Sequence, residues 1–313
     1  MRKVIAILIL LILIFMSALV TPSEISLAEI IEIPVDQTKM PDVNPANYVS
    51  EKEYKDPSLH IELERGKYED TNYLAIRIQI ANASQLRTAV SYNGKSREYD
   101  RWWISHVNPV LAISGDGFGD NFNGKGRHIV RQGKLYKSNA GPDRYGFNGF
   151  DALIIDDAGD FHIIRNATED DFSAFEGNIV NCFSFGPALV IDGELVTDML
   201  EDNTYQHLYG GVKKARRICI SQTGELSYMI VQTDGPEDPD RTGLEIDRFA
   251  RLVHSLGAIN AYNLDGGSST RVLYNGKSID SPYPNTKSQK RTIGDIIYFA
   301  SAYIDDSAVP EEE

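Results

Sequence analysis

The chain has 313 residues, of which 42% are hydrophobic and 24% are charged, a composition typical of folded globular proteins and not of disordered ones. Its formal net charge of −14 argues against nucleic acid as a partner, because a phosphate backbone requires a basic protein surface. The chain has only 2 cysteines and neither a C-x-x-C nor an H-E-x-x-H motif, which argues against a structural zinc site.

The first residues have the organisation of an export signal. Arg2 and Lys3 precede the mostly apolar residues 4–20, and a small-residue cleavage motif follows at Ser26-Leu27-Ala28. The alternative is an uncleaved membrane anchor, because the apolar stretch is close to the shortest helix that spans a bilayer. Both interpretations of residues 1–28 predict an extracellular or cell-surface protein. The protein would contact the membrane only through this segment, and only if the segment is not cleaved.

The next segment has the composition of a linker. Residues 29–70 are polar and are interrupted by prolines, which favours an extended lead-in. The remaining sequence shows no internal repeat and no second composition regime. We therefore expect one domain over residues 71–305, followed by a solvated acidic tail over residues 306–313.

The domain is predicted to consist mainly of short strands. Residues 73–86 alternate apolar and polar side chains, as a half-buried strand does. Further strand candidates, separated by Gly, Asp and Asn turns, lie at residues 109–114, 150–156, 160–164, 188–196, 216–222, 226–233, 271–279 and 293–304. One helix is expected within residues 243–258, where apolar residues follow helical spacing and Gly257 provides a C-terminal stop. This pattern predicts an α+β fold, a single domain with a mixed, largely antiparallel sheet and few helices.

The two cysteines each lie in a strand-like run. Cys182 falls in N-C-F-S-F-G and Cys219 in R-R-I-C-I-S. A disulfide between neighbouring strands would suit an exported protein. Two buried free thiols are the alternative.

Clusters of glycine and acidic residues recur at predicted strand ends, over residues 113–124, 183–194 and 263–270. Such clusters can converge into a pocket that offers both backbone N–H donors and carboxylates. Asp265 directly follows a buried strand and precedes two glycines; its alternative role is that of a turn acid bonded to their amides. The first cluster resembles a calcium loop in composition but lacks the required spacing of acids. No metal or other cofactor is predicted, and a divalent cation such as calcium is the alternative.

Taken in order, these segments resemble the phosphodiester glycosidase family. The quoted matches are G-L at 243–244, L-G-A at 256–258, N-L-D-G-G-S-S at 263–269, A-I-S-G-D-G-F at 112–118, F-G-P-A-L-V-I-D-G-E at 185–194, A-R-R-I-C-I-S-Q at 215–222 and K-R-T-I-G-D at 290–295. The resemblance runs from Tyr73 to Tyr303 and departs from the family at Asp116, where Asn is frequent, and at Ser221-Gln222.

The resemblance implies an enzyme, a hydrolase that cleaves a sugar such as alpha-N-acetylglucosamine from a glycosyl-1-phosphodiester in a cell-surface glycan or glycoconjugate. A glycosyl phosphate leaves as a stable anion, so charge stabilisation matters more than protonation of the leaving group. We expect Asp265 to be the carboxylate at the anomeric carbon and Asp116 to be its partner. The expected substrate- and phosphate-binding residues are Arg216 or its neighbour Arg217, Arg291, Asn263, Gly266, Gly267, Ser268 and Ser269.

Two other functions are compatible with the same sequence. One is a non-catalytic domain that binds a carbohydrate or envelope polymer, for which Trp102 and Trp103 could supply an aromatic platform. The other is transfer of a glycosyl group to an acceptor in exopolysaccharide biosynthesis. Retention of Asp265 together with the arginines favours the enzyme, with a glycan or sugar-phosphodiester as its partner.

Overall fold

The computed structural model describes residues 29–116, 127–139, 150–199, 213–236, 238, 242–279 and 291–304. The chain divides into two units, one of residues 1–29 with 304–313 and one of residues 30–303. Strands β1 (Glu29–Ile30) and β20 (Tyr303–Ile304) lie at the boundary between the units. The second unit contains the sheets and helices from β2 to β19.

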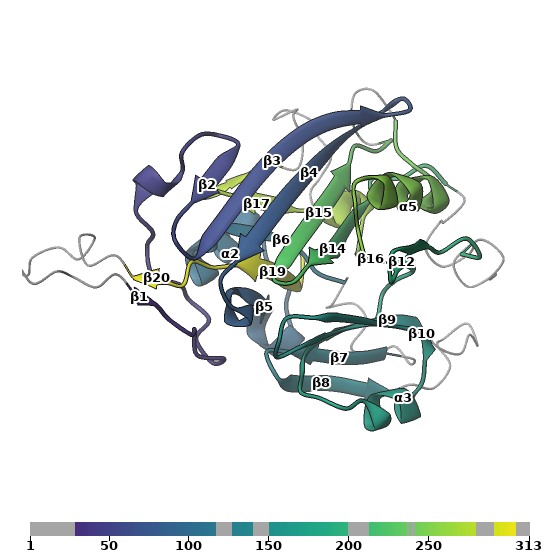
Figure 1. Cartoon of the computed structure of the whole chain (residues 1–313), viewed down its shortest axis with the longest axis horizontal. Helices are drawn as coiled ribbons and strands as arrows, with labels where there is room; N and C mark the ends of the chain where they lie inside the picture. Colours follow the sequence, from purple (N-terminus) through teal and green to yellow (C-terminus); the bar gives the residue numbers. More distant parts are fainter. Residues whose placement is uncertain are drawn as a thin grey trace, which may run out of the picture. The chain divides into compact units, whose positions relative to one another are not determined.

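The largest sheet has eight strands in the order β13-β12-β16-β14-β15-β4-β3-β2 (Figure 1). Its strands are β13 (Glu194–Leu195), β12 (Ala188–Ile191), β16 (Asn260–Asn263), β14 (Ile218–Gly224), β15 (Ser227–Thr233), β4 (Thr71–Ile80), β3 (Leu59–Tyr68) and β2 (Glu53–Lys55). Every pairing in it is antiparallel. In β4, Leu74, Ile76, Ile78 and Ile80 alternate onto one buried face, which is the period-2 pattern that identifies a strand.

Two further sheets have five strands each, in the orders β18-β17-β6-β19-β5 and β10-β9-β11-β7-β8. The first contains β18 (Lys277–Ser278), β17 (Val272–Tyr274), β6 (Leu111–Ser114), β19 (Asp295–Phe299) and β5 (Leu86–Val90). The second contains β10 (Phe161–Ala167), β9 (Phe150–Asp156), β11 (Ile179–Phe183), β7 (Arg127–Arg131) and β8 (Lys134–Asn139). The described α-helices are α2 (Asp100–Val107), α3 (Glu169–Ala174) and α5 (Ile246–Ser255), and the 3-10 helices are η1 (Pro45–Asn47), η2 (Ala83–Gln85), η3 (Ser91–Gly94) and η4 (Gly267–Ser269).

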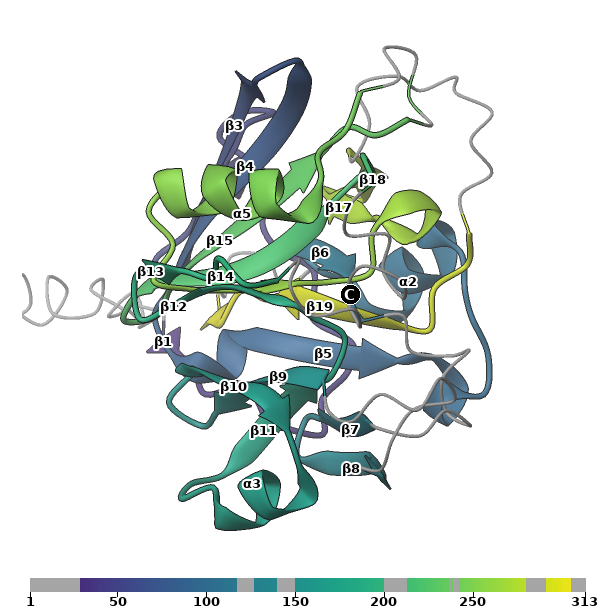
Figure 2. The ribbon, with the colours of Figure 1, turned by 90° about the vertical axis from the view of Figure 1, so that its right-hand side faces the viewer.

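The hydrophobic clusters show how these elements are layered. One face of the eight-stranded sheet packs against β6, β17 and β19, and its other face packs against α5, as Figure 2 shows. The far side of the β6–β19 sheet packs against Trp103 and Val107 of α2. The order is therefore helix, sheet, sheet, helix, and β6 and β19 are buried between covered faces. The β7–β11 sheet has a separate small cluster with Phe172 of α3.

This architecture confirms the predicted α+β class with largely antiparallel sheets and few helices. The predicted strands are present, and α5 lies inside the expected segment and ends before Gly257, whose φ of 97° is the left-handed conformation expected of a C-terminal stop. The strands are distributed over several sheets, which the strand pattern alone does not specify. Among the described helices, none is long and apolar enough to cross a bilayer. The expected leader, the acidic tail and residues 117–124 of the calcium-like loop lie outside the described residues.

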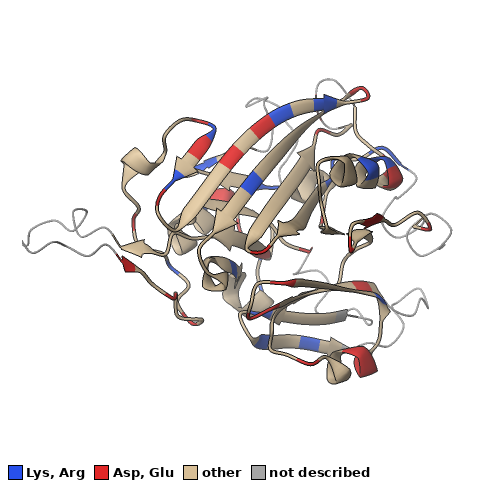
Figure 3. Ribbon diagram, in the orientation of Figure 1, with Lys and Arg blue, Asp and Glu red and all other residues tan. Residues whose placement is uncertain are grey.

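Residues 29–70 differ from the expected linker. They supply β2 and β3 to the eight-stranded sheet, and Tyr54 and Ile61 are fully buried. The buried guanidinium of Arg87 donates hydrogen bonds to the backbone carbonyls of Pro34 and Gln37 at 2.8 and 2.7 Å, which fixes the first part of the segment. Strand β3 was not predicted because only its first residues are buried in the core. The rest of the strand carries the charged residues visible in Figure 3.

The predicted disulfide is wrong. Cys182 and Cys219 are both free and buried. Cys182 lies in β11 of a five-stranded sheet and Cys219 lies in β14 of the eight-stranded sheet, so their strands are not neighbours. Burial raises the pKa of each thiol to about 12, so both remain neutral.

Candidate active site

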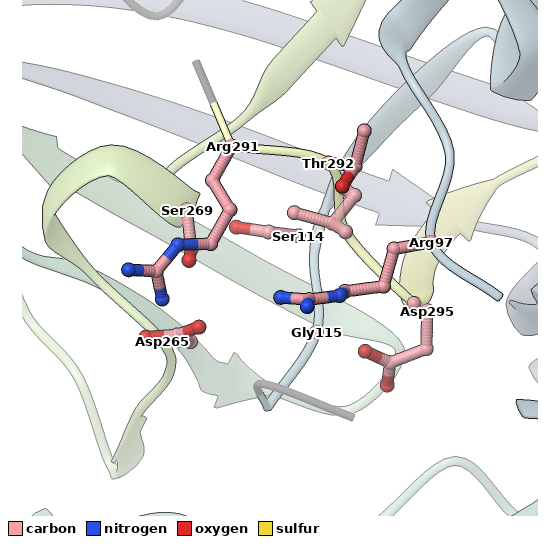
Figure 4. Close-up of a pocket in the computed structure, with 10 residues that line it drawn as sticks. Arg97, Ser114, Gly115, Asp265, Ser269, Arg291, Thr292 and Asp295 are labelled. Atoms are coloured by element: carbon pink, nitrogen blue, oxygen red, sulfur yellow. The ribbon is translucent and has the colours of Figure 1, made fainter. Parts of the chain in front are cut away.

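A pocket opens where four segments of the second unit meet (Figure 4). The segments are the stretch before α2 that carries Arg97, the end of β6, the loop after β16, and the chain that leads into β19. The lining residues are Arg97, Ser114, Gly115, Asp265, Ser269, Arg291, Thr292, Ile293, Gly294 and Asp295. Convergence of glycine-rich strand ends, expected from the sequence, is thus observed for two of the three clusters. The third cluster, after β11, does not line the pocket, and its Ser184 contacts Asp116 behind the pocket wall.

The loop after β16 holds Asp265 at the edge of this pocket. The backbone N–H of Gly267 donates to the carbonyl of Arg216 at 2.9 Å, and that of Asp265 donates to the carbonyl of Gly115 at 3.3 Å. A Cβ on Gly266 would lie only 2.4 Å from the carbonyl oxygen of Arg216. Glycine is required here because the loop lies directly against the start of β14. The loop is therefore fixed to two sheets at once.

The two guanidinium groups of the pocket come from separate segments. Figure 4 shows that the side chains of Arg97 and Arg291 point into the same region as the carboxylates of Asp265 and Asp295. The backbone N–H of Arg291 donates to the carbonyl of Ser268 at 3.2 Å, which joins its segment to the Asp265 loop. Paired guanidinium groups are well suited to bind the oxygens of a phosphate.

Arg271 holds these segments together from within the core. Its Nε donates to Asp100 of α2 at 2.7 Å, and its Nη1 donates to the carbonyl of Ser268 at 3.0 Å. Its Nη2 donates to the carbonyl of Arg291. The side chain is 1% exposed, so these bonds are made in a low-dielectric environment where they are strong. Arg271 thus determines where Arg291 begins its path toward the pocket.

A buried ionic triad lies behind the pocket wall. Arg131 Nη2 is 2.9 Å from Asp116 Oδ1 and 2.8 Å from Asp295 Oδ2, and its Nε donates to Asp295 at 3.1 Å. Asp116 also accepts the backbone N–H of Ser184 at 3.0 Å. Burial, with the nearby charge of Asp116, raises the pKa of Asp295 to about 7, although the positive charge of Arg131 opposes the shift. Asp295 is the member of the triad that reaches the pocket.

The structure brings together most, but not all, of the residues expected from the sequence. Asp265, Arg291 and Ser269 line the pocket, and Gly266, Gly267 and Ser268 form the loop beside it. Asn263 lies behind that loop, where its Nδ2 donates to the carbonyl of Gly186 at 2.8 Å. Asp116 is not among the lining residues and forms an ion pair with Arg131 behind the pocket.

Arg216 and Arg217 do not line the pocket. The guanidinium of Arg216 is buried and forms an ion pair with Asp238. The guanidinium of Arg217 donates to the backbone carbonyls of Leu244 and Lys213. Two arginines at the start of a buried strand could equally support the loops around it, and the sequence does not distinguish this role from phosphate binding.

Five contributors to the site were not singled out by the sequence. They are Arg97, Ser114, Arg131, Asp295 and Arg271. Two of them could have been found from the sequence. Asp295 and Arg271 each stand at the start of an apolar strand, where a buried charge must be paired. Arg97 lies in a polar segment before α2 and carried no such signal.

A group that could hold a metal ion occurs elsewhere in the described part of the chain. Glu53, His60 and Glu62 place their ligand atoms within 4.8 Å of one another. These residues belong to β2 and β3 and do not line the pocket.

Two sequence comparisons relate this chain to known proteins. The phosphodiester glycosidase family matches residues 108–300, a range that includes most of the pocket. An uncharacterized prophage-derived protein of Bacillus subtilis, YomE, is 30% identical over 172 residues, which are 55% of this chain and 25% of that protein. The chain thus aligns with only a quarter of this relative's length.

Solved structures share the fold. The catalytic domain of zebrafish N-acetylglucosamine-1-phosphodiester alpha-N-acetylglucosaminidase, auto-inhibited by its pro-peptide, superposes with a TM-score of 0.62 at 17% identity, over 87% of this chain and 98% of that one. A hypothetical protein from Synechocystis superposes with a TM-score of 0.51 at 13% identity, over 79% of this chain and 62% of that one. At these identities the structures establish a shared fold, whereas the family match covers more than half of the sequence. The chain belongs to the phosphodiester glycosidase family.

Proposed function

We propose that the protein hydrolyses a glycosyl-1-phosphodiester and releases the free sugar. The observation that carries this proposal is the placement of Asp265 in one pocket with the guanidinium groups of Arg97 and Arg291. A carboxylate for the sugar and two cations for the phosphate are the groups that the reaction requires.

In the proposed reaction, Arg97 and Arg291 bind the phosphate oxygens and stabilise the charge that develops as the bond from the anomeric carbon to the phosphate oxygen breaks. The electron pair of that bond leaves with the phosphate. Asp265 acts at the anomeric carbon in one of two ways. It is either the nucleophile, in which case water then hydrolyses the bond between its carboxylate and the sugar, or the base that takes a proton from the attacking water. Ser269 supports the site by donating its hydroxyl hydrogen to the substrate. A phosphate monoester anion and a free sugar are the products.

The first substrate to test follows from the shared fold. The zebrafish protein is named for an N-acetylglucosamine-1-phosphodiester, so alpha-linked N-acetylglucosamine is the sugar that we propose for this chain. The export-like composition of residues 1–28 supports a substrate outside the cytoplasm, in a cell-surface glycan or glycoconjugate. Cell fractionation with N-terminal sequencing of the mature protein would test this location.

The activity is tested by measuring release of N-acetylglucosamine from an alpha-N-acetylglucosamine-1-phosphodiester. The expected result is release by the natural protein and a loss of at least about 100-fold in kcat for a folded Asp265→Asn variant. Equal activity in both would remove Asp265 from the mechanism. A parallel reaction with an acceptor glycan distinguishes hydrolysis from transfer, since transfer would yield a longer glycan in place of free sugar. Binding without turnover by the natural protein would instead support a non-catalytic carbohydrate-binding domain.

A further inference from the structure

Among the residues that the structure describes, the charged groups in and directly behind the pocket are balanced. Three guanidinium groups, those of Arg97, Arg131 and Arg291, face three carboxylates, those of Asp116, Asp265 and Asp295. The fully ionised set is therefore neutral before any ligand enters. An anion that binds in this pocket adds a negative charge to a set that already contains enough negative charge to match its cations.

The other described titratable groups around the triad do not alter this balance. Arg271 is paired with Asp100 and adds no net charge. The thiol of Cys182 is neutral because burial raises its pKa to about 12, and burial lowers the pKa of His128, which favours the neutral imidazole. A proton taken up on ligand binding therefore goes to a carboxylate, either that of Asp265 or one of the two that flank Arg131.

Two of those carboxylates share a single guanidinium. Arg131 lies 2.9 Å from Asp116 and 2.8 Å from Asp295, and all three side chains are at most 2% exposed. Both carboxylates cannot be fully compensated by one positive charge where water is excluded. Two acids in such an arrangement titrate as a coupled pair, and the pair retains one proton at a higher pH than an isolated carboxyl group does. The geometry thus creates a proton-binding site beside the pocket.

On the proposed function, which places a phosphodiester in this pocket, we infer that binding of the phosphate anion draws one proton from solvent onto the Asp116–Asp295 pair. Asp295 lines the pocket, so its negative charge would repel the bound phosphate most directly. Protonation removes that repulsion and gives Asp295 an O–H that can donate to a phosphate oxygen. Gly115 supports this arrangement because it leaves no side chain between Asp295 and the pocket.

The affinity of the pocket for the anion is expected to depend on pH. Because the bound state holds one more proton than the free state, binding must strengthen as the pH falls. Above the pKa of the free pair, the Kd for a phosphodiester is expected to rise about tenfold for each pH unit until the pair in the complex also loses its proton. The raised pKa of Asp295 places the start of this range near neutrality.

The test measures proton uptake without relying on turnover. The full-length protein is titrated calorimetrically with dimethyl phosphate, a phosphodiester whose own charge stays at −1, in two buffers with different ionisation enthalpies. We expect the natural protein to take up more than about half a proton per anion bound at about pH 8. Asp295→Asn and Asp116→Asn each remove one charge from the pair, so both variants are expected to bind the anion with no proton uptake and with a Kd independent of pH. Two variants are used so that the loss of one to misfolding leaves the other to decide.

A matched control is available in the β9–β10 hairpin. Asp151 is a fully buried aspartate paired with Arg165 and does not line the pocket. Asp151→Asn is expected to retain the proton uptake of the natural protein. Anion binding by the natural protein without proton uptake would overturn the inference, as would uptake that persists in both pair variants. Absence of anion binding would overturn it together with the phosphate-binding role of the pocket. Binding with proton uptake but without sugar release would overturn the proposed function alone.

Discussion

Gly115 lies so close to Asp295 that a Cβ at position 115 would be 2.2 Å from the Asp295 Oδ2. The carboxylate cannot move aside freely, because Arg131 holds it with two hydrogen bonds. The glycine at the end of β6 is therefore part of the triad's geometry and does not serve only as a turn residue.

The first prediction concerns this contact. Gly115→Ala should displace Asp295 from Arg131 and lower the free energy of unfolding by about 2 kcal/mol, because a buried charge loses part of its compensation. Gly224→Ala is the control, since its new methyl group would come no nearer than 3.7 Å to Ser227 and should cost less than about 1 kcal/mol. Urea unfolding measures both. Equal stability of the two variants would contradict a tight Gly115–Asp295 contact.

A second prediction concerns Arg271, which joins α2, the Asp265 loop and the segment of Arg291. Arg271→Met should lower the free energy of unfolding by about 3 kcal/mol, because Asp100 and several backbone carbonyls lose their donor. It should also raise KM more than it lowers kcat if Arg291 serves mainly in substrate binding. Arg248→Met tests an exposed ion pair with Glu69 and should change stability by no more than about 0.5 kcal/mol. An unchanged KM in Arg271→Met would show that Arg291 keeps its place without this support.

The sequence predicts the position of the Asp265 loop at the end of β16 because the residues that determine this position are neighbours in the chain. An acid that directly follows a buried strand and precedes two glycines lies at the C-terminal end of that strand, whatever the rest of the fold. The partners of Asp265 could not be found in the same way. Arg97 and Arg291 are far apart in the sequence, and the pairing of Glu98 with Ile293 brings their segments together.

Arg216 was expected to bind phosphate, and it does not line the pocket because its side-chain direction depends on contacts with residues distant in the sequence. Arg216 stands at the start of β14, near the Asp265 loop, and its backbone carbonyl does contact that loop. Its side chain points toward Asp238, which follows β15. The sequence can indicate that a backbone segment lies near the site. The direction of each side chain depends on contacts with distant residues, which only the folded structure shows.

A third prediction concerns the cysteines. Neither cysteine is in a disulfide, and burial raises both thiol pKa values to about 12. A thiol reagent should therefore react with neither cysteine of the folded protein at neutral pH. A thiol assay should therefore detect no reactive group in the native protein and 2 groups after denaturation without a reductant, which is the full cysteine content. One or no thiol in the denatured protein would indicate oxidation and contradict this arrangement.

A fourth prediction concerns the dependence of stability on pH. The pKa of Asp295 is raised in the folded state by burial and by Asp116, so its contribution to stability is present below the ordinary carboxyl pKa and is lost as the pH rises through about 7. Chemical unfolding at a series of pH values should show the natural protein losing stability relative to Asp295→Asn between about pH 4 and about pH 7. A constant difference between the two proteins over this range would show that Asp295 is ionised throughout.

The final prediction separates the two arginines that the sequence treated alike. Arg291 is exposed and lines the pocket, so Arg291→Met should raise KM for a phosphodiester about 10- to 100-fold, the loss expected for hydrogen bonds to a charged group, while stability changes by less than about 0.5 kcal/mol. Arg216→Met should instead lower the free energy of unfolding by about 3 kcal/mol, because it leaves Asp238 buried without its partner. Unfolding curves and steady-state kinetics on the same two variants check both parts. If Arg216→Met raised KM as much as Arg291→Met without loss of stability, the phosphate would bind at the start of β14, and the pocket would not be the substrate site.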